Sequence, residues 1–153
     1  MRPTITEQLA GTCRILEEVV APELAGAQAA DALRGLVKNL RMLETSWSSV
    51  LPFLHWDNDA TAGLLGQARR SVPSPLAERI DTACAETAPD PIDLDAVHSV
   101  NNRLRNLLSE VVLVLDPAEP AHAGIVAHLA ARTARYPMRM VPDMPSGAGT
   151  AGR

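Results

Sequence analysis

Apolar residues recur every three or four positions along most of the chain, which is the spacing of amphipathic α-helices. The first such stretch follows a Thr4–Glu7 capping box and is carried by Ile5, Leu9, Cys13, Leu16 and Val20. A second, longer stretch runs from about Gln28 to Leu51. Pro52 is expected to end or kink that helix, because proline lacks a backbone donor and crowds the preceding turn.

Two shorter helices are predicted between this stretch and the next long one. The first covers 60–71, ATAGLLGQARRS, with Asp57 or Asn58 as its N-cap. The second enters at Ser74–Pro75, a cap followed by proline, and its apolar positions are Leu76, Ile80 and Cys84.

The most regular stripe begins after Asp93, which is expected to cap its helix. It consists of Leu94, Val97, Asn101, Leu104, Leu108, Val111 and Leu115. A last helix follows Asp116–Pro117, with its inward side predicted to be Ile125, Val126, Leu129 and Thr133. The pattern therefore predicts an all-α fold, a four-helix-type bundle domain over 1–136 with two short extra helices. Residues 137–153 are rich in Pro, Gly and Ser and are expected to form a flexible, disordered tail.

Composition narrows the classes of function. Aromatic residues make up only 3% of the chain and the net charge is −4, so neither a base-stacking platform nor a basic field favours nucleic-acid binding. No apolar stretch reaches the length needed to cross a bilayer, and no signal peptide is visible, which favours a cytoplasmic protein. Cys13 and Cys84 lie far apart among apolar neighbours and are expected to be small buried thiols.

Two carboxylate–histidine pairs raise the question of a metal site. Asp95 with His98, and Glu119 with His122, each have the spacing that places both side chains on one helical face. The two helices are joined by a tight turn and should run antiparallel, so the pairs should lie at opposite ends. We therefore expect no metal and no cofactor. Sequence signatures of a nucleophile or a phosphate-binding loop are also lacking, so no catalytic residue is named.

The segment LHWDND, residues 54–59, allows two interpretations. His55, Asp57 and Asp59 could supply metal ligands or a general base. Alternatively, the segment is a corner after Pro52, where Trp56 packs the end of the bundle and the polar residues cap the next helix. The position between two helical patterns favours the corner.

Asn101 is the one polar member of the most regular stripe. Together with His98, Asn102 and Arg105 it spans about two helical turns, so these four residues are the candidate binding residues. They could line a small polar pocket or form a contact to a partner helix. In the plainer interpretation, Asn101 is satisfied by another helix of the same chain. If Asn101 selects a partner, Asn101→Leu should raise thermal stability and weaken association.

Two further features are more often structural than functional. Arg34, Lys38 and Arg41 recur at helical spacing and could hold an acidic partner or a phosphate, although a solvated face is more common. His128 lies on the apolar side of the last helix and is expected to be a satisfied core histidine.

Three segments, TITEQLAGTCRILEEVVAPEL, LVKNLRMLETSW and AVHSVNNRLRNLL, resemble a bacterial family of helical domains of unknown function. The likeness covers residues 3–115 and rests on helix-periodic text, and nothing after Asp116 resembles the family. Its members are encoded beside, or fused to, aminoglycoside-phosphotransferase-like kinases and acyl-CoA dehydrogenases. The family offers no catalytic residues to carry over, so the resemblance implies an accessory role beside such an enzyme.

Two hypotheses follow. In the first, the chain is a non-enzymatic helical bundle that binds another protein, either a second copy of itself or a phosphotransferase-like enzyme. In the second, it binds a small molecule or catalyses a reaction in a polar pocket around Asn101. The direction of the four candidate side chains distinguishes the two, since inward favours a pocket and outward a contact surface.

Overall fold

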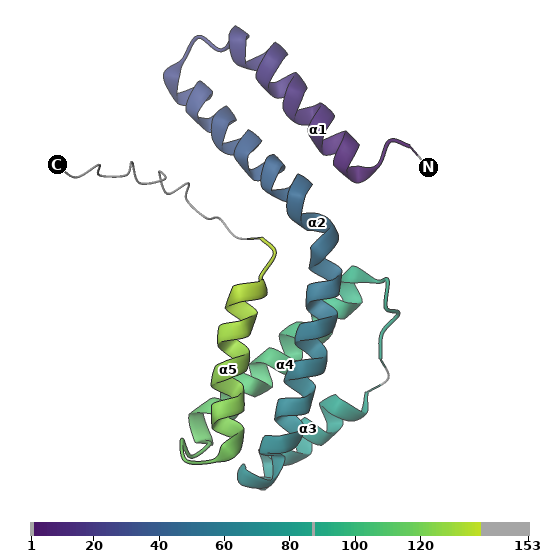
Figure 1. Ribbon diagram of the computed structural model, residues 1–153, viewed down its shortest axis with the longest axis vertical. Coiled ribbons are helices and arrows are strands. Elements are labelled where there is room, and N and C mark those ends of the chain that lie inside the picture. Colours follow the sequence, from purple (N-terminus) through teal and green to yellow (C-terminus); the bar gives the residue numbers. More distant parts are fainter. Residues whose placement is uncertain (1, 87, 139–153) are drawn as a thin grey trace, which may run out of the picture. The chain divides into compact units, whose positions relative to one another are not determined.

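The computed structural model describes residues 2–86 and 88–138, and every regular element within them is a helix (Figure 1). The all-α class is therefore confirmed. The α-helices are α1 (Ile5–Ile15), α2 (Ala27–Ala68), α3 (Ser74–Ala85), α4 (Leu94–Val114) and α5 (Pro120–Arg135). The chain divides into two compact units, one within Met1–Trp47 and the other Ser48–Pro137. Apart from residues 137 and 138, the predicted tail 137–153 lies outside the described residues.

The first unit is a helical hairpin made of α1 and the beginning of α2. The capping box is present, since the Glu7 backbone N–H donates to Thr4 Oγ1 at 3.2 Å and the Thr4 N–H donates to Glu7 Oε2 at 2.7 Å. After α1 the chain continues as a π-helix, η1 (Leu16–Val20), and a 3₁₀ turn, η2 (Ala21–Glu23). The two arms lie side by side in Figure 1, and Trp47 Nε1 donates to Thr6 Oγ1 across them at 3.1 Å.

Helix α2 is continuous through Pro52, so the expected break there was wrong, as was a separate helix over 60–71. Proline removes one donor from the helix ladder, but packing decides whether the helix continues. The buried face resumes directly after it, at Phe53, Leu54, Asp57, Thr61, Leu65 and Ala68. LHWDND is therefore an interior stretch of α2, and Asp57 and Asn58 cap no helix.

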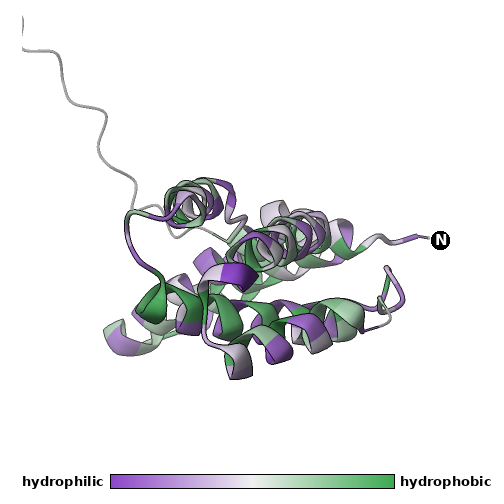
Figure 2. Ribbon diagram, turned by 90° about the horizontal axis from the view of Figure 1, so that it is seen from below, coloured by the Kyte–Doolittle hydropathy of each residue, from purple (hydrophilic) through white to green (hydrophobic). Residues whose placement is uncertain are grey.

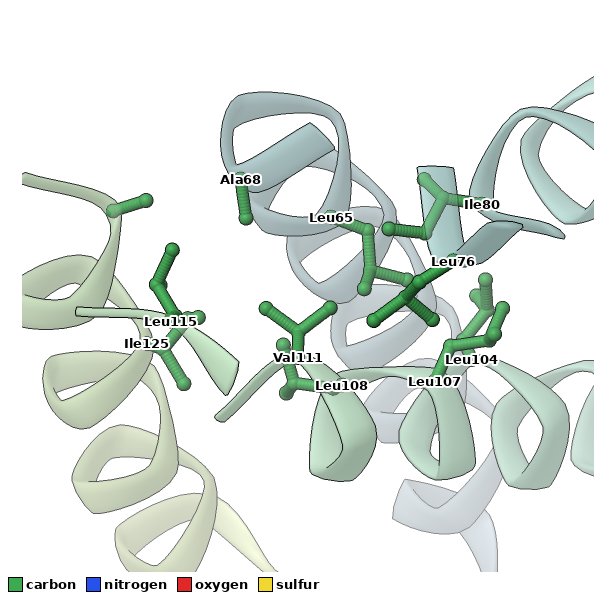
Figure 3. Packing of buried hydrophobic residues seen from close by; sticks show 11 residues of the cluster. Leu65, Ala68, Leu76, Ile80, Leu104, Leu107, Leu108, Val111, Leu115 and Ile125 are labelled. Carbon is green, nitrogen blue, oxygen red and sulfur yellow. The ribbon is translucent and has the colours of Figure 1, made fainter. Parts of the chain in front are cut away.

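The main core of the second unit is built where α2, α3, α4 and α5 meet (Figure 3). Leu65 and Ala68 of α2 and Leu76 and Ile80 of α3 point toward the apolar stripe of α4. This stripe is buried as predicted from Val97 to Leu115, but its first predicted member, Leu94, is exposed. Asp93 caps α4, with its carboxylate accepting from the Ala96 backbone N–H at 3.0 Å. Green and purple residues alternate along the helices in Figure 2, as expected of amphipathic elements.

The inward side of α5 differs from the prediction. Ile125 is buried, but Val126, Leu129 and Thr133 are exposed, and the buried positions are instead Ala121, Ile125 and His128. A different face of α5 is therefore buried from the one predicted. His128 and Arg132 account for the difference, because both have hydrogen-bonding partners in the interior of the second unit. Cys13 is buried as expected, whereas Cys84 is exposed.

No helix among residues 2–86 and 88–138 has both the length and the apolar character that a membrane span requires.

Candidate functional site

A layer of polar side chains crosses the interior of the second unit. We call it the polar layer and define it by Asp57, Asn58, Thr61, Asn101, His128 and Arg132. It lies between two apolar clusters. On α2, Phe53 and Leu54 precede it and Leu65 follows, and on α4 Val97 precedes it and Leu104 follows. On α2, α4 and α5, polar residues thus interrupt the buried apolar face where these three helices pack against one another.

Asp57 is the centre of the polar layer. Its side chain is fully buried, at 0% exposure, and three donors converge on it. Asn101 Nδ2 and Arg132 Nε donate to Oδ2 at 2.7 and 2.9 Å, and His128 Nε2 lies 3.0 Å from Oδ1. Convergent donors suit an ionised carboxylate, which can only accept hydrogen bonds. The Arg132 guanidinium then compensates a charge that would be very costly to bury alone.

The remaining hydrogen bonds complete the polar layer. Asn101 Nδ2 also donates to Asn58 Oδ1 at 2.8 Å, and Asn58 Nδ2 donates to the Val97 carbonyl at 3.2 Å. Asn101 is therefore satisfied by other side chains of its own chain, which confirms the plainer interpretation. His128 is likewise a hydrogen-bonded core histidine, as predicted.

Aromatic rings cover one side of the polar layer. The Trp56 ring contacts the His128 ring at a centroid distance of 5.2 Å, and the Arg132 guanidinium lies 5.5 Å from the Phe53 ring centre. Arg135 stacks over Trp56 at 4.4 Å. These cation–π contacts hold both arginines of α5 in place. Trp56 of LHWDND thus forms part of a wall of the polar layer and does not lie at a helix corner.

Asp57, His128 and Thr61 resemble a catalytic triad in composition but not in geometry. In a triad the carboxylate binds one ring nitrogen and the nucleophilic hydroxyl binds the other, so the ring can pass a proton between them. Here Thr61 Oγ1 lies 3.3 Å from the same Nε2 that faces Asp57. The hydroxyl is also fully buried. This arrangement orients the histidine and does not activate a nucleophile.

A small hollow of about 60 Å³ adjoins the polar layer between α4 and α5. The volume exceeds what one water molecule needs and suits a small polar group. Its walls contain two arginines, one histidine and an apolar rim: Thr61, Arg105, Leu108, Ser109, Val112, His128, Leu129 and Arg132.

The four candidate binding residues do not come together in one pocket. Asn101 is in the polar layer and Arg105 lines the hollow, whereas His98 and Asn102 are exposed on α4. Whether any of the four binds a ligand stays a prediction. Within the described ranges, no group of three or more His, Cys, Asp and Glu residues is arranged to hold a metal ion.

Sequence reasoning missed Asp57 as a buried residue, and with it the role of Arg132. The signal was present in the four-residue spacing of Phe53, Asp57, Thr61 and Leu65, which continues one face of α2 past Pro52. His128 and Arg132 repeat the same spacing on α5.

No protein-family model matches the chain, and no curated protein and no solved structure matches it.

Proposed function

We propose that the chain is a non-enzymatic helical module that binds another protein through the surface formed by α4 and α5. The observation that carries the proposal is the apolar rim of the hollow. Val112 of α4 is 37% exposed and Leu129 of α5 is 43% exposed, and both line the same hollow. Val126, one turn before Leu129, is 54% exposed. Apolar side chains gathered beside a groove are typical of interaction surfaces.

The exposed face of α4 extends this surface. His98, Asn102, Arg105, Ser109 and Val112 follow one another at intervals of four and three residues, so they form one stripe along the helix. All five are exposed. Three of the four candidate binding residues belong to this stripe, and outward side chains favour a contact surface over a pocket. An amphipathic helix laid along α4 would meet polar residues first and the apolar rim last.

Charge adds a requirement on the partner. Arg105 makes no ion pair with any described residue, while the neighbouring Arg132 is already bonded to Asp57. A partner helix that carries an Asp or Glu beside its apolar anchors would pair with Arg105 and cover Val112 and Leu129. Such complementarity contributes mainly to specificity and association rate.

Two further parts of the proposal concern the location of the protein and the identity of its partner. Both cysteines are free, which fits the reducing cytoplasm. The resemblance of residues 3–115 to domains encoded beside phosphotransferase-like kinases makes such a kinase the first partner to test, and a second copy of this chain the next.

The test is photo-crosslinking from defined positions. A photoreactive phenylalanine analogue is placed at position 112 and, as a matched control, at position 99 on another exposed face of α4. We expect a discrete crosslinked product from position 112 only, and its loss with Leu129→Glu. Equal products from both positions, or none from position 112, would remove the proposal. Native mass spectrometry distinguishes a second copy from a different protein.

A small-molecule role is the second candidate, favoured by the hollow beside His128. It requires a ligand no larger than a small anion, held by Arg105. Native mass spectrometry of the purified chain tests it, since a ligand adds mass that disappears on denaturation. A chain of bare polypeptide mass, unchanged after incubation with acetate, bicarbonate and phosphate, would exclude this candidate.

A further inference from the structure

The first unit contains a groove of about 550 Å³ between α2 and the η1 and η2 segments that follow α1. We propose that this groove binds a small amphipathic anion, a molecule with a carboxylate or phosphate head on a short apolar chain. Its walls are Glu17, Ala21, Ala30, Leu33, Arg34, Val37, Lys38 and Arg41. The volume lies within the roughly 300–1,000 Å³ of small-molecule pockets. This inference does not rest on the function proposed above, because it concerns the other unit.

The floor of the groove is apolar. Val37 is 8% exposed, and Leu33, Ala30 and Ala21 are half-buried around it. Three of these four side chains come from α2 and repeat at helical spacing, so they form one continuous strip. A hydrocarbon chain laid on this strip would remove apolar surface from water on both sides.

The rim of the groove is cationic. Arg34, Lys38 and Arg41 lie three or four residues apart on α2. Arg34 pairs with Asp31, and Arg41 pairs with Glu17 at 2.9 Å and Glu44 at 3.2 Å. The hydrogen bonds that Arg41 donates to Glu17 and Glu44 raise the pKa of Arg41, so its charge is already paired with these carboxylates.

Lys38 is the exception. It is the only lysine in the chain, and it makes no ion pair or hydrogen bond with any described residue. Its ammonium group is therefore the uncompensated positive charge of the groove. An anionic head placed beside Lys38 would have its apolar chain on the strip of Val37 and Leu33.

The wall opposite α2 has an unusual backbone. Glu17 lies in the π-helix Leu16–Val20 and Ala21 in the 3₁₀ turn that follows. Such π-helical turns are rare and occur frequently at functional sites. The groove thus combines an irregular wall, an apolar floor and one unpaired cation.

The groove favours a small molecule over a nucleic acid. Glu17 stands on its wall, and two of its three cations are neutralised by neighbouring carboxylates. A phosphate backbone would meet these acidic groups along its length, whereas a single anionic head reaches Lys38 alone.

The sole lysine makes the test specific. Reductive methylation with ¹³C-formaldehyde labels primary amines and keeps their positive charge, so it gives one lysine signal beside that of the α-amino group in a carbon–proton NMR spectrum. The signal that disappears in Lys38→Arg is that of Lys38. Decanoate and decyl phosphate are titrated separately, so that carboxylate and phosphate heads are distinguished, with decanol as the uncharged control. We expect a saturable shift of the Lys38 signal with at least one anion and a much weaker response to decanol. The absence of a saturable shift with both anions, or equal binding of decanol, would overturn the proposal.

Calorimetric titration of variants provides the second measurement. Lys38→Gln should lower the affinity for the anion about tenfold, the loss typical of one charge-assisted hydrogen bond. Lys38→Arg should retain most of the affinity. Arg14→Gln is the matched control, because it removes one exposed charge from the same hairpin outside the groove. If Arg14→Gln weakens binding as much as Lys38→Gln does, the anion responds to net charge and the groove is not its site. Circular dichroism confirms that each variant remains helical.

Discussion

The carboxylate of Asp57 and the guanidinium of Arg132 meet inside the second unit, with Oδ2 2.9 Å from Nε. Asp57 is 0% exposed and the Arg132 side chain 19% exposed, so solvent screens the pair little. A paired charge in such a place contributes little net stability by itself, but removal of one partner leaves the other without compensation. This asymmetry determines what substitutions in the polar layer should do.

Asp57→Ala should lower the free energy of unfolding by about 3–5 kcal/mol, because Arg132, His128 and Asn101 all lose their acceptor. Urea unfolding followed by circular dichroism measures the change. Asp59→Ala is the matched control, since Asp59 lies two residues further along α2 and is exposed. The control should stay within about 0.5 kcal/mol of the parent chain. Equal effects of the two substitutions would mean that the polar layer contributes nothing particular.

Asn101→Leu should lower stability, the opposite of what the hypothesis that Asn101 selects a partner predicts. The substitution removes both donor contacts, leaving Asp57 Oδ2 with one donor fewer and Asn58 Oδ1 without this partner. The expected cost is about 1–3 kcal/mol for buried groups left unpaired. Thermal and urea unfolding measure it, with Asn102→Leu as the exposed neighbour for comparison. A stabilised Asn101→Leu variant would show that the hydrogen bonds around Asp57 are dispensable.

The fold was largely accessible from the sequence because helix periodicity and capping are local signals. The capping box at Thr4, the cap at Asp93 and the buried stripe from Val97 to Leu115 are all present. Pro52 misled the prediction, because a local rule about backbone donors gave no measure of the packing that continues on both sides of it. The buried face of α5 could not be predicted for a similar reason. Its inward face is selected by Asp57, which lies 71 positions before His128.

The site was accessible only in part. Asn101 is conspicuous because a polar residue interrupts an apolar stripe, and Arg105 follows one turn later. Asp57 offered no such contrast, since it stands beside Asn58 and Asp59 and acidic residues are common at helix starts. Its burial can be inferred only once the packing of α4 and α5 is known, because these helices place Asn101, His128 and Arg132 around it. Periodicity describes each helix separately and does not predict which turns of different helices pack against one another.

Glycines in the helices of the second unit offer a test of local packing. A Cβ at Gly63 would meet nothing within 4 Å, so Gly63→Ala should stabilise the chain by about 0.5–1 kcal/mol through helix propensity. A Cβ at Gly124 would lie 3.1 Å from Leu64 Cδ2, so the end of that side chain must shift. Gly124→Ala should therefore gain less than Gly63→Ala. Urea midpoints rank the two, and a larger gain at Gly124 would contradict the packing of α5 against Leu64.

The pair formed by Arg79 of α3 and Glu110 of α4 should give a pH-dependent contribution to stability. Two hydrogen bonds, at 2.6 and 2.7 Å, join the guanidinium to the carboxylate. Arg79 thereby lowers the pKa of Glu110. A carboxylate with a lowered pKa in the folded state stabilises the fold above its unfolded pKa, about 4.3 for Glu. That contribution is lost as the pH falls through the lowered value.

The difference in urea midpoint between the parent chain and Glu110→Gln isolates this contribution. It should be constant near neutral pH, shrink as the pH falls below about 4, and decrease in high salt because both groups are partly exposed. Glu78→Gln serves as the control, since the Glu78 carboxylate makes no ion pair with any described residue. A difference for Glu110→Gln that persists unchanged down to pH values well below 4 would show that the side chain stabilises α3 against α4 by packing, and that its charge is not involved.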